Sequence, residues 1–466
     1  MSKLRNFVDQ IRKNPNAIFF SRLTFYFLLG LWALNGDPFK LGSATDQASE
    51  RTYDRVSAPF YSSYREIDGF SDDILVVLIN DTSVDNLYNQ QFITANDWPL
   101  TYNDHALLIS KLIQAKPKAI FVDIMFYRER STDNSLDEAI EWLGFELSKT
   151  GQNTKLLFAQ GPAVSPMSEN MKNKLRAIGE LSINSWQAPE NTYELMQNDI
   201  PVTATKLFQI ACQNNAHYPG CRDVTDSSQY SEPMRVTWGS RSAPSVLPYR
   251  ADNCRLPPQS FSEQLGAMTS QLYDGFLGKE SYQNDVCSFT RHVYAEELIA
   301  LSRSENPDEI RLYKELIEDK IILYATDFQG FKDSVITPVH GEVPGVFMHA
   351  MALDNLLSQG AEYRRAIEPG SLNMAIWTVW VILLCIFVRL YPNKMPLILA
   401  LGLWATYSTI VIGILHFGAG VALSNWISLL MLSGLTLRMA YLDLTEFFLS
   451  KIQSLVTTAD ESPKKI

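Results

Sequence analysis

The sequence predicts a membrane protein with two parts, a layered α/β domain outside the membrane and four α-helical transmembrane spans. Three observations lead to this fold class. Four apolar segments each have about the 17–25 residues that a bilayer-spanning helix needs. Residues 35–371, between the first and second segments, alternate strand-like and helical patterns. Four of the five cysteines lie in this same region, as expected of a domain in an oxidising compartment.

The first apolar segment, residues 17–34, follows a short polar N-terminus of residues 1–16. Its single charge, Arg22, stands near the start, where a long side chain reaches the headgroups at small cost. A cleaved signal peptide is the alternative. The apolar stretch is longer than a usual signal core, however, and no small-residue cleavage site follows closely, so we expect an anchor.

Three further apolar segments, residues 372–391, 397–415 and 419–437, predict the other spans. Lysines and arginines gather next to the ends of the segments that belong on one side, and such clusters mark the cytoplasm. We therefore expect both termini in the cytoplasm of a bacterium, the chain in its inner membrane and residues 35–371 in the periplasm. The residues concerned are Lys3, Arg5, Arg12, Lys13, Arg389, Lys394, Arg438 and Lys451. Arg364 and Arg365 argue mildly against this orientation, but long exported domains follow the charge rule poorly.

The exported cysteines are expected to form two disulfides. Of the three possible pairings we favour Cys212 with Cys221 and Cys254 with Cys287, because the first pair brackets a short loop containing a Tyr-Pro-Gly turn. Four separately buried thiols are the alternative. Cys385 lies within the second span.

Strands and helices alternate along the exported region in the order of a βαβ fold. Continuous apolar runs predict strands buried on both faces, as in a parallel sheet. They lie in residues 72–84, 119–126, 155–161 and 319–328, and helical patterns occupy residues 103–115, 135–150, 292–301 and 309–318.

The middle of the region, residues 162–283, is rich in Asn, Ser, Pro and Gln. It contains a possible strand at 233–240 and a possible helix at 260–276. We expect excursions of the same domain that the disulfides restrain, with a small second lobe as the alternative.

Several segments together resemble the CHASE domain of type 2, the cyclase and histidine-kinase-associated extracellular sensing domain. They are ILVVLINDTSVDNL, WPLTYNDHALLISKLIQAKPKAIFVDIMF and EDKIILYATDFQGFKDSVITPVHGEVPGVFMHAMALDNLLSQG. The likeness covers about residues 15–440 and is weak in the middle. It implies a sensory domain between one N-terminal span and three C-terminal spans, and it implies dimerisation. Family members usually continue into a cyclase or kinase, so here we expect a separate effector.

Candidate ligand-binding residues are those near strand ends and in the segments that carry the resemblance. Carboxylates at strand ends lie where binding sites gather in α/β sheets, although capping helices is a common alternative use. The candidates are Asp81, Trp98, Asp123, Asp333 and His349. We expect structural roles for His340, in the Pro- and Gly-containing turn, and for His349, which is expected to open the following helix. The apolar face of that helix is expected to run through Phe347, Met351 and Leu353 or Asp354 to Leu357.

No metal site, cofactor or catalytic motif is indicated. The sequence lacks the Cys/His spacings of zinc sites, a phosphate-binding Gly-Lys loop and a serine nucleophile elbow. The strand containing Asp123 faintly resembles that of aspartyl phosphatases, but Met125 stands where the second aspartate would be. A formal net charge of -11 disfavours nucleic acid as a partner.

The stretch after the fourth span, residues 438–456, predicts an amphipathic helix. Its apolar residues recur at three- and four-residue steps, and they are candidates for docking another subunit: Tyr441, Leu444, Phe448, Ile452 and Leu455. A helix lying on membrane lipid is the alternative. The tail, residues 457–466, is expected to be disordered.

The sequence as a whole predicts a sensor or receptor subunit that is not itself an enzyme. Its exported domain would bind a ligand or a periplasmic protein, and the membrane helices would relay the state to separate complex subunits, in a homo- or hetero-oligomer. A scaffold subunit that senses nothing is the alternative. An exported hydrolase using Asp81 or Asp123 is a weaker third hypothesis.

Overall fold

The computed structural model divides the chain into two compact units, Asp54–Ala366 and Met1–Tyr53 with Ile367–Ile466. We call them the α/β unit and the helical unit. The structure describes residues 15–36, 54, 58, 61, 73–151, 154–160, 166–183, 186–187, 191–213, 218, 220–221, 227–239, 260, 262–263, 266, 269–270, 289–328, 333–365, 370–391, 397–417 and 426–441.

A six-stranded sheet, parallel throughout, forms the centre of the α/β unit, which confirms the predicted layered fold class. Its strand order is β10-β1-β11-β2-β3-β4. The strands are β1 (Ile74–Ile79), β2 (Ala119–Val122), β3 (Lys155–Ala159), β4 (Glu180–Ser182), β10 (Arg291–Tyr294) and β11 (Ile321–Thr326). The strands β1, β2 and β11 are buried almost throughout, as continuous apolar runs predict.

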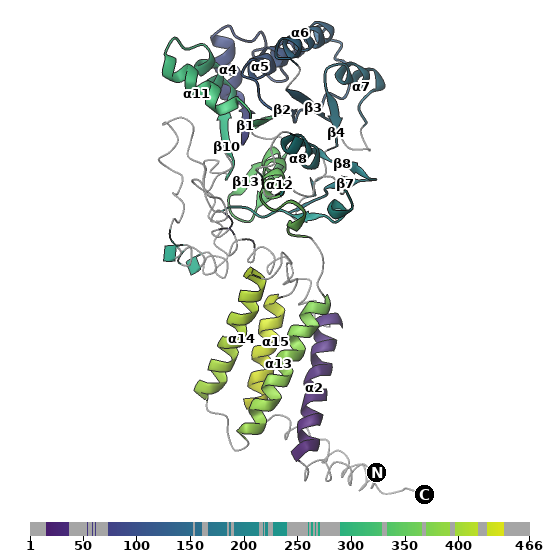
Figure 1. Cartoon of the computed structure of the whole chain (residues 1–466), viewed down its shortest axis with the longest axis vertical. Coiled ribbons are helices and arrows are strands. Elements are labelled where there is room, and N and C mark those ends of the chain that lie inside the picture. The colour runs from purple at the N-terminus through teal and green to yellow at the C-terminus, as the bar shows by residue number, and fades with distance from the viewer. Residues whose placement is uncertain are drawn as a thin grey trace, which may run out of the picture. The chain divides into compact units, whose positions relative to one another are not determined.

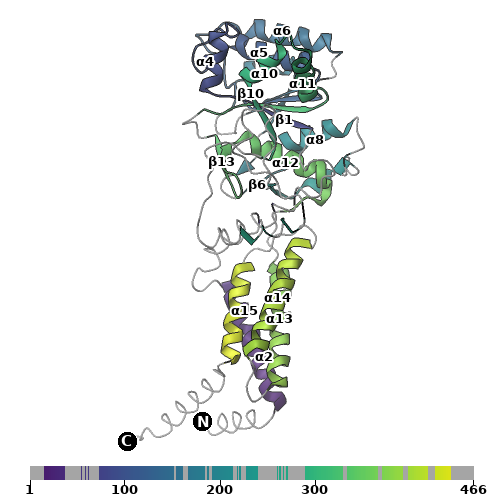
Figure 2. The same cartoon turned by 90° about the vertical axis from the view of Figure 1, so that its left-hand side faces the viewer.

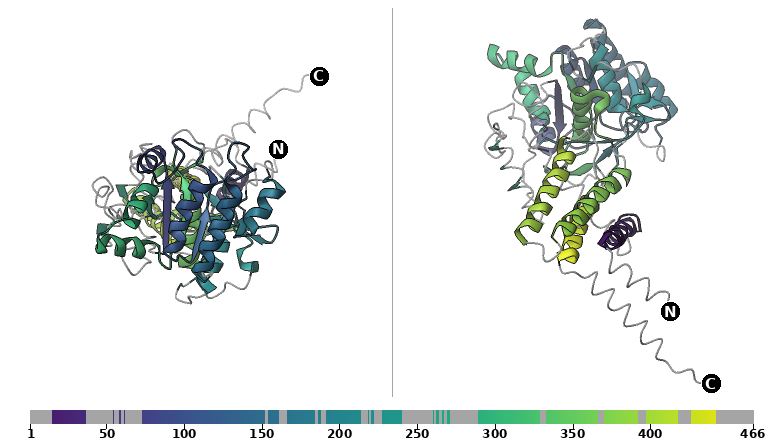
Figure 3. Two further views of the ribbon diagram at one scale, coloured as in Figure 1. Left: turned by 90° about the horizontal axis from the view of Figure 1, so that it is seen from above. Right: turned by 60° about the horizontal axis from the view of Figure 1, so that its bottom comes forward.

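Six helices cover one face of this sheet (Figures 1 and 2). They are α4 (Asp81–Asn89), α5 (Tyr102–Gln114), α6 (Leu136–Lys149), α7 (Glu169–Arg176), α10 (Ala295–Ser302) and α11 (Pro307–Ile317). The connections β1 to β2, β2 to β3, β3 to β4 and β10 to β11 all advance in the same direction across the sheet. Because such crossovers are right-handed, all their helices fall on one face, which Figure 3 shows from above.

The opposite face is covered by α8 (Thr203–Gln213) and α12 (Val346–Gln359), which pack together. Alternate strand residues point this way, among them Val76, Leu78 and Phe121. The residues of the predicted apolar face of α12 are buried, and so is every other residue from Val346 to Leu357. A helix that is apolar nearly all round belongs in a core.

Two sequence assignments need correction. Residues 292–294, predicted as the start of a helix, form the end of β10, where Val293 pairs with Val77 of β1, and the helix starts at Ala295. The strand expected to end at Asp81 stops two residues earlier, at Ile79, since Asn80 caps α4 by accepting a hydrogen bond from the Ser83 amide, 2.7 Å away.

The predicted strand at 233–240 is reduced to β9 (Met234–Arg235), which joins β5 (Trp186–Gln187) and β6 (Thr192–Tyr193) in a small antiparallel sheet. Two further pairs complete the strands, β7 (Met196–Gln197) with β8 (Ile200–Pro201) and β12 (Ser334–Thr337) with β13 (Gly341–Pro344). Short 3-10 helices occupy η3 (Ser227–Tyr230) and η4 (Gly360–Glu362). Most of the predicted helix at 260–276 lies outside the described residues.

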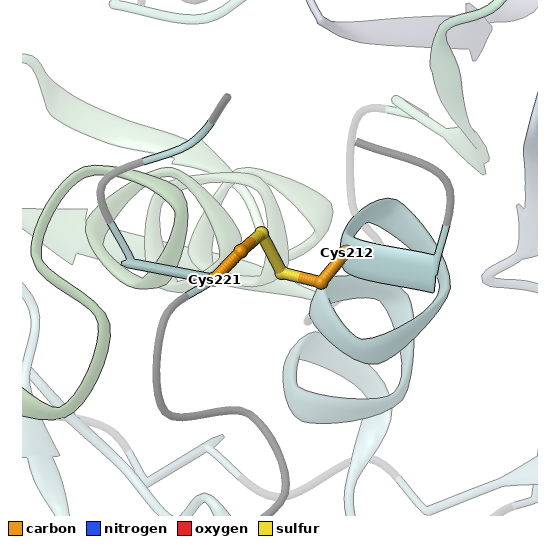
Figure 4. The surroundings of a disulfide bond; sticks show 2 residues. All are labelled: Cys212 and Cys221. Carbon is orange, nitrogen blue, oxygen red and sulfur yellow. A yellow bond between two sulfur atoms is a disulfide. The ribbon is translucent and has the colours of Figure 1, made fainter. Parts of the chain in front are cut away.

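The favoured disulfide between Cys212 and Cys221 is present (Figure 4). It joins the last turn of α8 to a segment that packs closely on the end of α12. A Cβ atom added to Gly220 would lie 2.1 Å from the Leu356 carbonyl oxygen, so glycine is required for this approach. Cys254 and Cys287, the other predicted pair, lie outside the described residues.

The helical unit contains α2 (Pro15–Gly36), α13 (Gly370–Leu390), α14 (Leu397–Phe417) and α15 (Trp426–Tyr441). Two segments, Asn16–Leu34 and Leu372–Leu390, are long and apolar enough to cross a membrane, and two shorter apolar helices, Ile398–Val411 and Ile427–Tyr441, accompany them. Four spans therefore remain a prediction.

Close packing and side-chain hydrogen bonds hold these helices together. The Trp377 ring of α13 lies so near α2 that a Cβ at Gly30 would come within 1.7 Å of its Nε1. Trp380 Nε1 donates to Thr436 Oγ1 at 3.0 Å. Small residues and hydroxyl partners of this kind are typical of helix contacts in membranes.

We predict that replacing both bonded cysteines, Cys212→Ser with Cys221→Ser, lowers the free energy of unfolding of the full chain in detergent by about 2–3 kcal/mol. The value is the chain entropy that a closed loop of this size removes from the unfolded state. Unfolding monitored by circular dichroism measures it. The control is Gln213→Ser at the exposed neighbouring position, and equal stability of the two variants would contradict the prediction.

Candidate functional site

The carboxyl ends of β11 and β2 form the part of the sheet where a site is expected. These strands are neighbours, but their following connections leave to opposite faces. The chain after β2 enters α6 in the six-helix layer, whereas the chain after β11 enters the β12–β13 hairpin and α12 on the other face. Ligand sites of open α/β sheets occur at such a switch in direction.

Asp123, Asp333, His349 and Tyr193 meet at this place, and we call them the carboxyl-edge cluster. His349 lies in the first turns of α12 and is fully buried. Its Nδ1 is 2.7 Å from the Tyr193 hydroxyl oxygen. The rings of Phe121 and Tyr193 pack edge-on against the imidazole, with centroids 5.3 and 5.5 Å away.

The hydrogen bonds of Tyr193 assign the tautomer of His349. The tyrosine oxygen accepts a hydrogen bond from the Ala204 amide at 3.1 Å. Its single proton is then best donated to His349 Nδ1, which leaves the imidazole proton on Nε2. Burial lowers the pKa of His349 to about 4, against an opposing effect of Asp333, so the ring is neutral near pH 7.

Asp123 follows β2 directly and lies opposite the second imidazole nitrogen. Its Oδ2 is 3.9 Å from His349 Nε2, and its side chain is 6% exposed. This distance is beyond a direct hydrogen bond. Among the described residues, His349 Nε2 has no hydrogen-bond partner, so the imidazole presents a buried donor toward a carboxylate that it does not reach.

Asp333 occupies the outer side of the cluster, where it is exposed to solvent. Its backbone oxygen accepts a hydrogen bond from the Gly345 amide at 2.9 Å, which ties it to the start of α12. Desolvation by the surrounding protein raises the pKa of its carboxyl group to about 6, Asp123 adds to the rise, and His349 opposes it. The cluster therefore runs from an exposed carboxyl group to a buried imidazole.

The other two predicted ligand residues lie elsewhere. Asp81 is exposed in the first turn of α4, where its charge complements the positive end of the helix dipole. Trp98 packs on the six-helix face against Phe328 and His105, with ring centroids 4.7 and 5.6 Å apart. The structure thus brings together Asp123, Asp333 and His349 and leaves Asp81 and Trp98 outside.

The expected structural role of His340 agrees with its contacts, since its Nε2 lies 2.7 Å from the Gly239 carbonyl oxygen next to the β12–β13 turn. His349, in contrast, is not the helix-opening residue that was expected. Gly345 holds the cap position of α12, and His349 lies one turn inside. Within the described residues, no group of three or more His, Cys, Asp or Glu side chains has a geometry suited to a metal ion.

Sequence reasoning missed Tyr193 and a second histidine pair. Tyr193 stands in the polar middle region, which carries no periodic signal. His105 Nδ1 lies 3.0 Å from the Tyr324 hydroxyl oxygen in the six-helix layer, and burial, followed by the charge of Arg130, lowers the pKa of His105 to about 3. The position of His105 on the buried face of α5 could have predicted that its imidazole needs a buried partner.

Two buried polar networks hold the chain termini of the α/β unit, and the first of them includes residues from the second half of α12. In the first, the Tyr61 hydroxyl donates to Asp354 Oδ2 at 2.6 Å and accepts from Asn355 Nδ2 at 3.0 Å. Asn355 also bonds the backbone N–H and C=O of Thr237. Tyr61 therefore fixes the entering chain on α12.

The second network is an ionic cluster around Asp54, which we call the Asp54 clamp. Arg364 Nη1 lies 2.7 Å from Asp54 Oδ1, and Arg235 Nη2 lies 3.0 Å from Oδ2. The Asp54 side chain is 1% exposed and each arginine side chain 6%. Asp54 is the first residue of the α/β unit and Arg364 stands near its last, so the clamp closes the unit where the chain enters and leaves.

A family model of the CHASE2 domain matches residues 24–391. The chain belongs to the CHASE2 domain family. CHASE2 is a family of extracytoplasmic sensory domains, and the match confirms the resemblance seen in the sequence. No curated protein and no solved structure gives a match.

We predict that Asp333→Asn stabilises this CHASE2 protein more at pH 7.5 than at pH 5. A carboxyl group whose folded pKa is raised stabilises the fold when protonated, and this contribution is lost as pH rises through about 6. Asparagine removes the charge that penalises the fold at high pH. Melting temperatures of the full chain in detergent at the two pH values measure the difference, with Asp85→Asn, on the exposed side of α4, as the control. An equal effect at both pH values would contradict the assignment.

We predict that Asp54→Ala lowers the free energy of unfolding by about 3–5 kcal/mol, since it leaves two buried arginines without their carboxylate. The matched control is Asp308→Ala, which breaks an exposed ion pair with Arg311 of 3.0 Å and should cost far less. Denaturant unfolding of the full chain in detergent compares the two. Similar losses in both variants would show that the clamp contributes no more than a surface pair.

Proposed function

We propose that this CHASE2 protein is a bacterial inner-membrane sensor subunit. Its extracytoplasmic domain binds a small ligand or a periplasmic protein at the carboxyl-edge cluster, and α12 relays the bound state to the chain segments that lead to α2 and α13. The membrane helices pass it to a separate effector. Both termini are cytoplasmic in this arrangement, and all four apolar helices span the membrane.

The observation that carries the proposal is that one helix, α12, contributes residues both to the carboxyl-edge cluster and to the hydrogen-bond network around Tyr61. His349, near the start of α12, lies in the carboxyl-edge cluster, and Asp354 and Asn355, further along, bind Tyr61. A helix of 14 residues is about 20 Å long, and α12 is buried along its first twelve residues. A close-packed helix moves as a unit, because interiors at this density do not deform locally.

The chemistry of the cluster supports binding over catalysis, and we propose that the chain is not an enzyme. Within the described residues, the hydrogen bond of the His349 ring goes to Tyr193. Burial raises the pKa of Tyr193 far above the physiological range, so its phenol stays protonated. An imidazole held by a protonated phenol activates no nucleophile. Purified protein that turns over a nucleotide or an ester would refute this part.

The effector is expected to dock at the cytoplasmic end. Tyr441 ends α15 and is 45% exposed, as an available docking residue must be. Leu444, Phe448, Ile452 and Leu455 lie outside the described residues. A mild-detergent pull-down that compares the full chain with a truncation after Tyr441 tests this docking. The scaffold alternative gains if the same partners copurify with both.

We predict that a ligand found by thermal-shift screening of the full chain in lipid nanodiscs will bind at least tenfold more weakly to Asp123→Asn. Removing the charge of a buried carboxylate that contacts a ligand costs 1.4 kcal/mol or more, which is about tenfold. The control is Asp85→Asn, and unchanged affinity in Asp123→Asn would place the site elsewhere.

The relay has a separate test in Tyr61→Phe, which removes the hydroxyl bonded to Asp354. We expect this variant to bind the ligand normally and to lose the ligand-induced change in hydrogen exchange around residues 360–365. Tyr88→Phe, at an exposed tyrosine of α4, is the control. A normal response in Tyr61→Phe would refute transmission through this contact.

A further inference from the structure

We propose that the ligand of the carboxyl-edge cluster is the proton, so that this CHASE2 domain senses extracytoplasmic pH; the inference rests on the proposed sensor function. The geometry that points to it is a buried imidazole N–H directed at a carboxylate 3.9 Å away, with a second carboxyl group at the solvent side of the same cluster. Protons from solvent reach this second carboxyl group, Asp333. The contacts within the cluster then differ between its protonated and its ionised form.

Among the described residues, four titratable groups face one another here, from four parts of the fold. They are Asp123 after β2, Tyr193 of β6, Asp333 before β12 and His349 of α12. Tyr193 does not titrate in the physiological range. Two acids and one imidazole remain. Asp123 opposes ionisation of Asp333, and Asp333 favours protonation of the imidazole. Asp333 therefore holds a proton more tightly than it would without Asp123 beside it.

Proton uptake alters the contacts at the start of α12. At neutral pH the carboxylates of Asp123 and Asp333 repel each other across the cluster. A proton on Asp333 removes that repulsion, and because the Asp333 backbone binds the Gly345 amide, any shift of Asp333 acts on the cap of α12. At lower pH a proton on His349 converts the 3.9 Å gap to Asp123 into an ion pair, whose usual distance is about 2.7–2.9 Å. Both steps draw the start of α12 toward the end of β2.

Other ligand classes fit the cluster less well. An anion would meet two carboxyl groups, which repel it. The described side chains do not form a metal-binding group. A cationic amine would pair with the carboxylates, and it is therefore the competing ligand in the experiment.

Methyl NMR of two methionines tests the proposal on the full chain in lipid nanodiscs with 13C-methyl methionine. Met348 is next to His349 in α12, and Met234 in β9 is next to Arg235 of the Asp54 clamp; both are fully buried. Their signals are assigned with Met348→Leu and Met234→Leu. Met348 reports the cluster and Met234 reports the far end of the relay.

We expect both methyl signals to shift with one common midpoint between about pH 5 and pH 7. In Asp333→Asn this shift is lost, whereas Asp85→Asn behaves like the wild type. His349→Gln, which cannot take up a proton, keeps this midpoint and loses any further change below about pH 5. A pH response of Met348 that persists unchanged in both Asp333→Asn and His349→Gln would overturn the proposal.

The remaining outcomes separate the two proposals. If Met348 shifts with pH and Met234 does not, the proton site stands and the relay is refuted. If neither signal responds to pH but the diamine putrescine shifts both, the relay stands and the proton is not the ligand. If neither pH nor putrescine shifts Met348, the cluster is no proton site and the inference fails.

Discussion

The burial of α12 against the parallel sheet is the interaction on which the rest of the α/β unit depends. All its residues from Val346 to Leu357 are buried, between the sheet on one side and α8 on the other. The polar residues it carries, His349, Asp354 and Asn355, are consequently buried too, and each requires a partner from another part of the chain. Those partners are Tyr193 and Tyr61, and through them one helix fixes both the small antiparallel sheet and the entering chain.

The two charged clusters of the domain show different electrostatic designs. In the Asp54 clamp, one carboxylate bonds two arginines directly, at 2.7 and 3.0 Å. In the carboxyl-edge cluster, Asp123 lies 3.9 Å from a neutral imidazole, too far for a hydrogen bond, and Asp333 lies on the solvent side. Direct ion pairs suit a fixed contact between chain segments, whereas a gap between ionisable groups suits a site whose state changes on binding. The family assignment as a sensory domain agrees with the presence of both.

Much of the candidate site was open to prediction because strand ends can be recognised locally. The apolar runs around Ile74–Ile79 and Ala119–Val122 predicted buried strands, and Asp123 followed from the end of one of them. Asp333 and His349 were named from their segment, but their meeting with Asp123 was not predicted. Arg364 was read as a charge at odds with the membrane orientation, whereas it is buried against Asp54. The conflict between Arg364 and the rule that positive charges lie on the cytoplasmic side was the available sign that this residue has a buried partner.

The sequence by itself determined the central strands β1, β2, β3 and β11, the helices α5, α6 and α11, the family and the Cys212–Cys221 bridge, because periodicity, turn residues and short loops act between near neighbours. The tertiary structure alone decided which polar groups meet. Asp54 and Arg364 are 310 positions apart and Tyr193 and His349 are 156 apart, distances over which no local pattern carries information. Such pairs form because each group is buried by the packing of apolar neighbours and must then find a partner inside the fold.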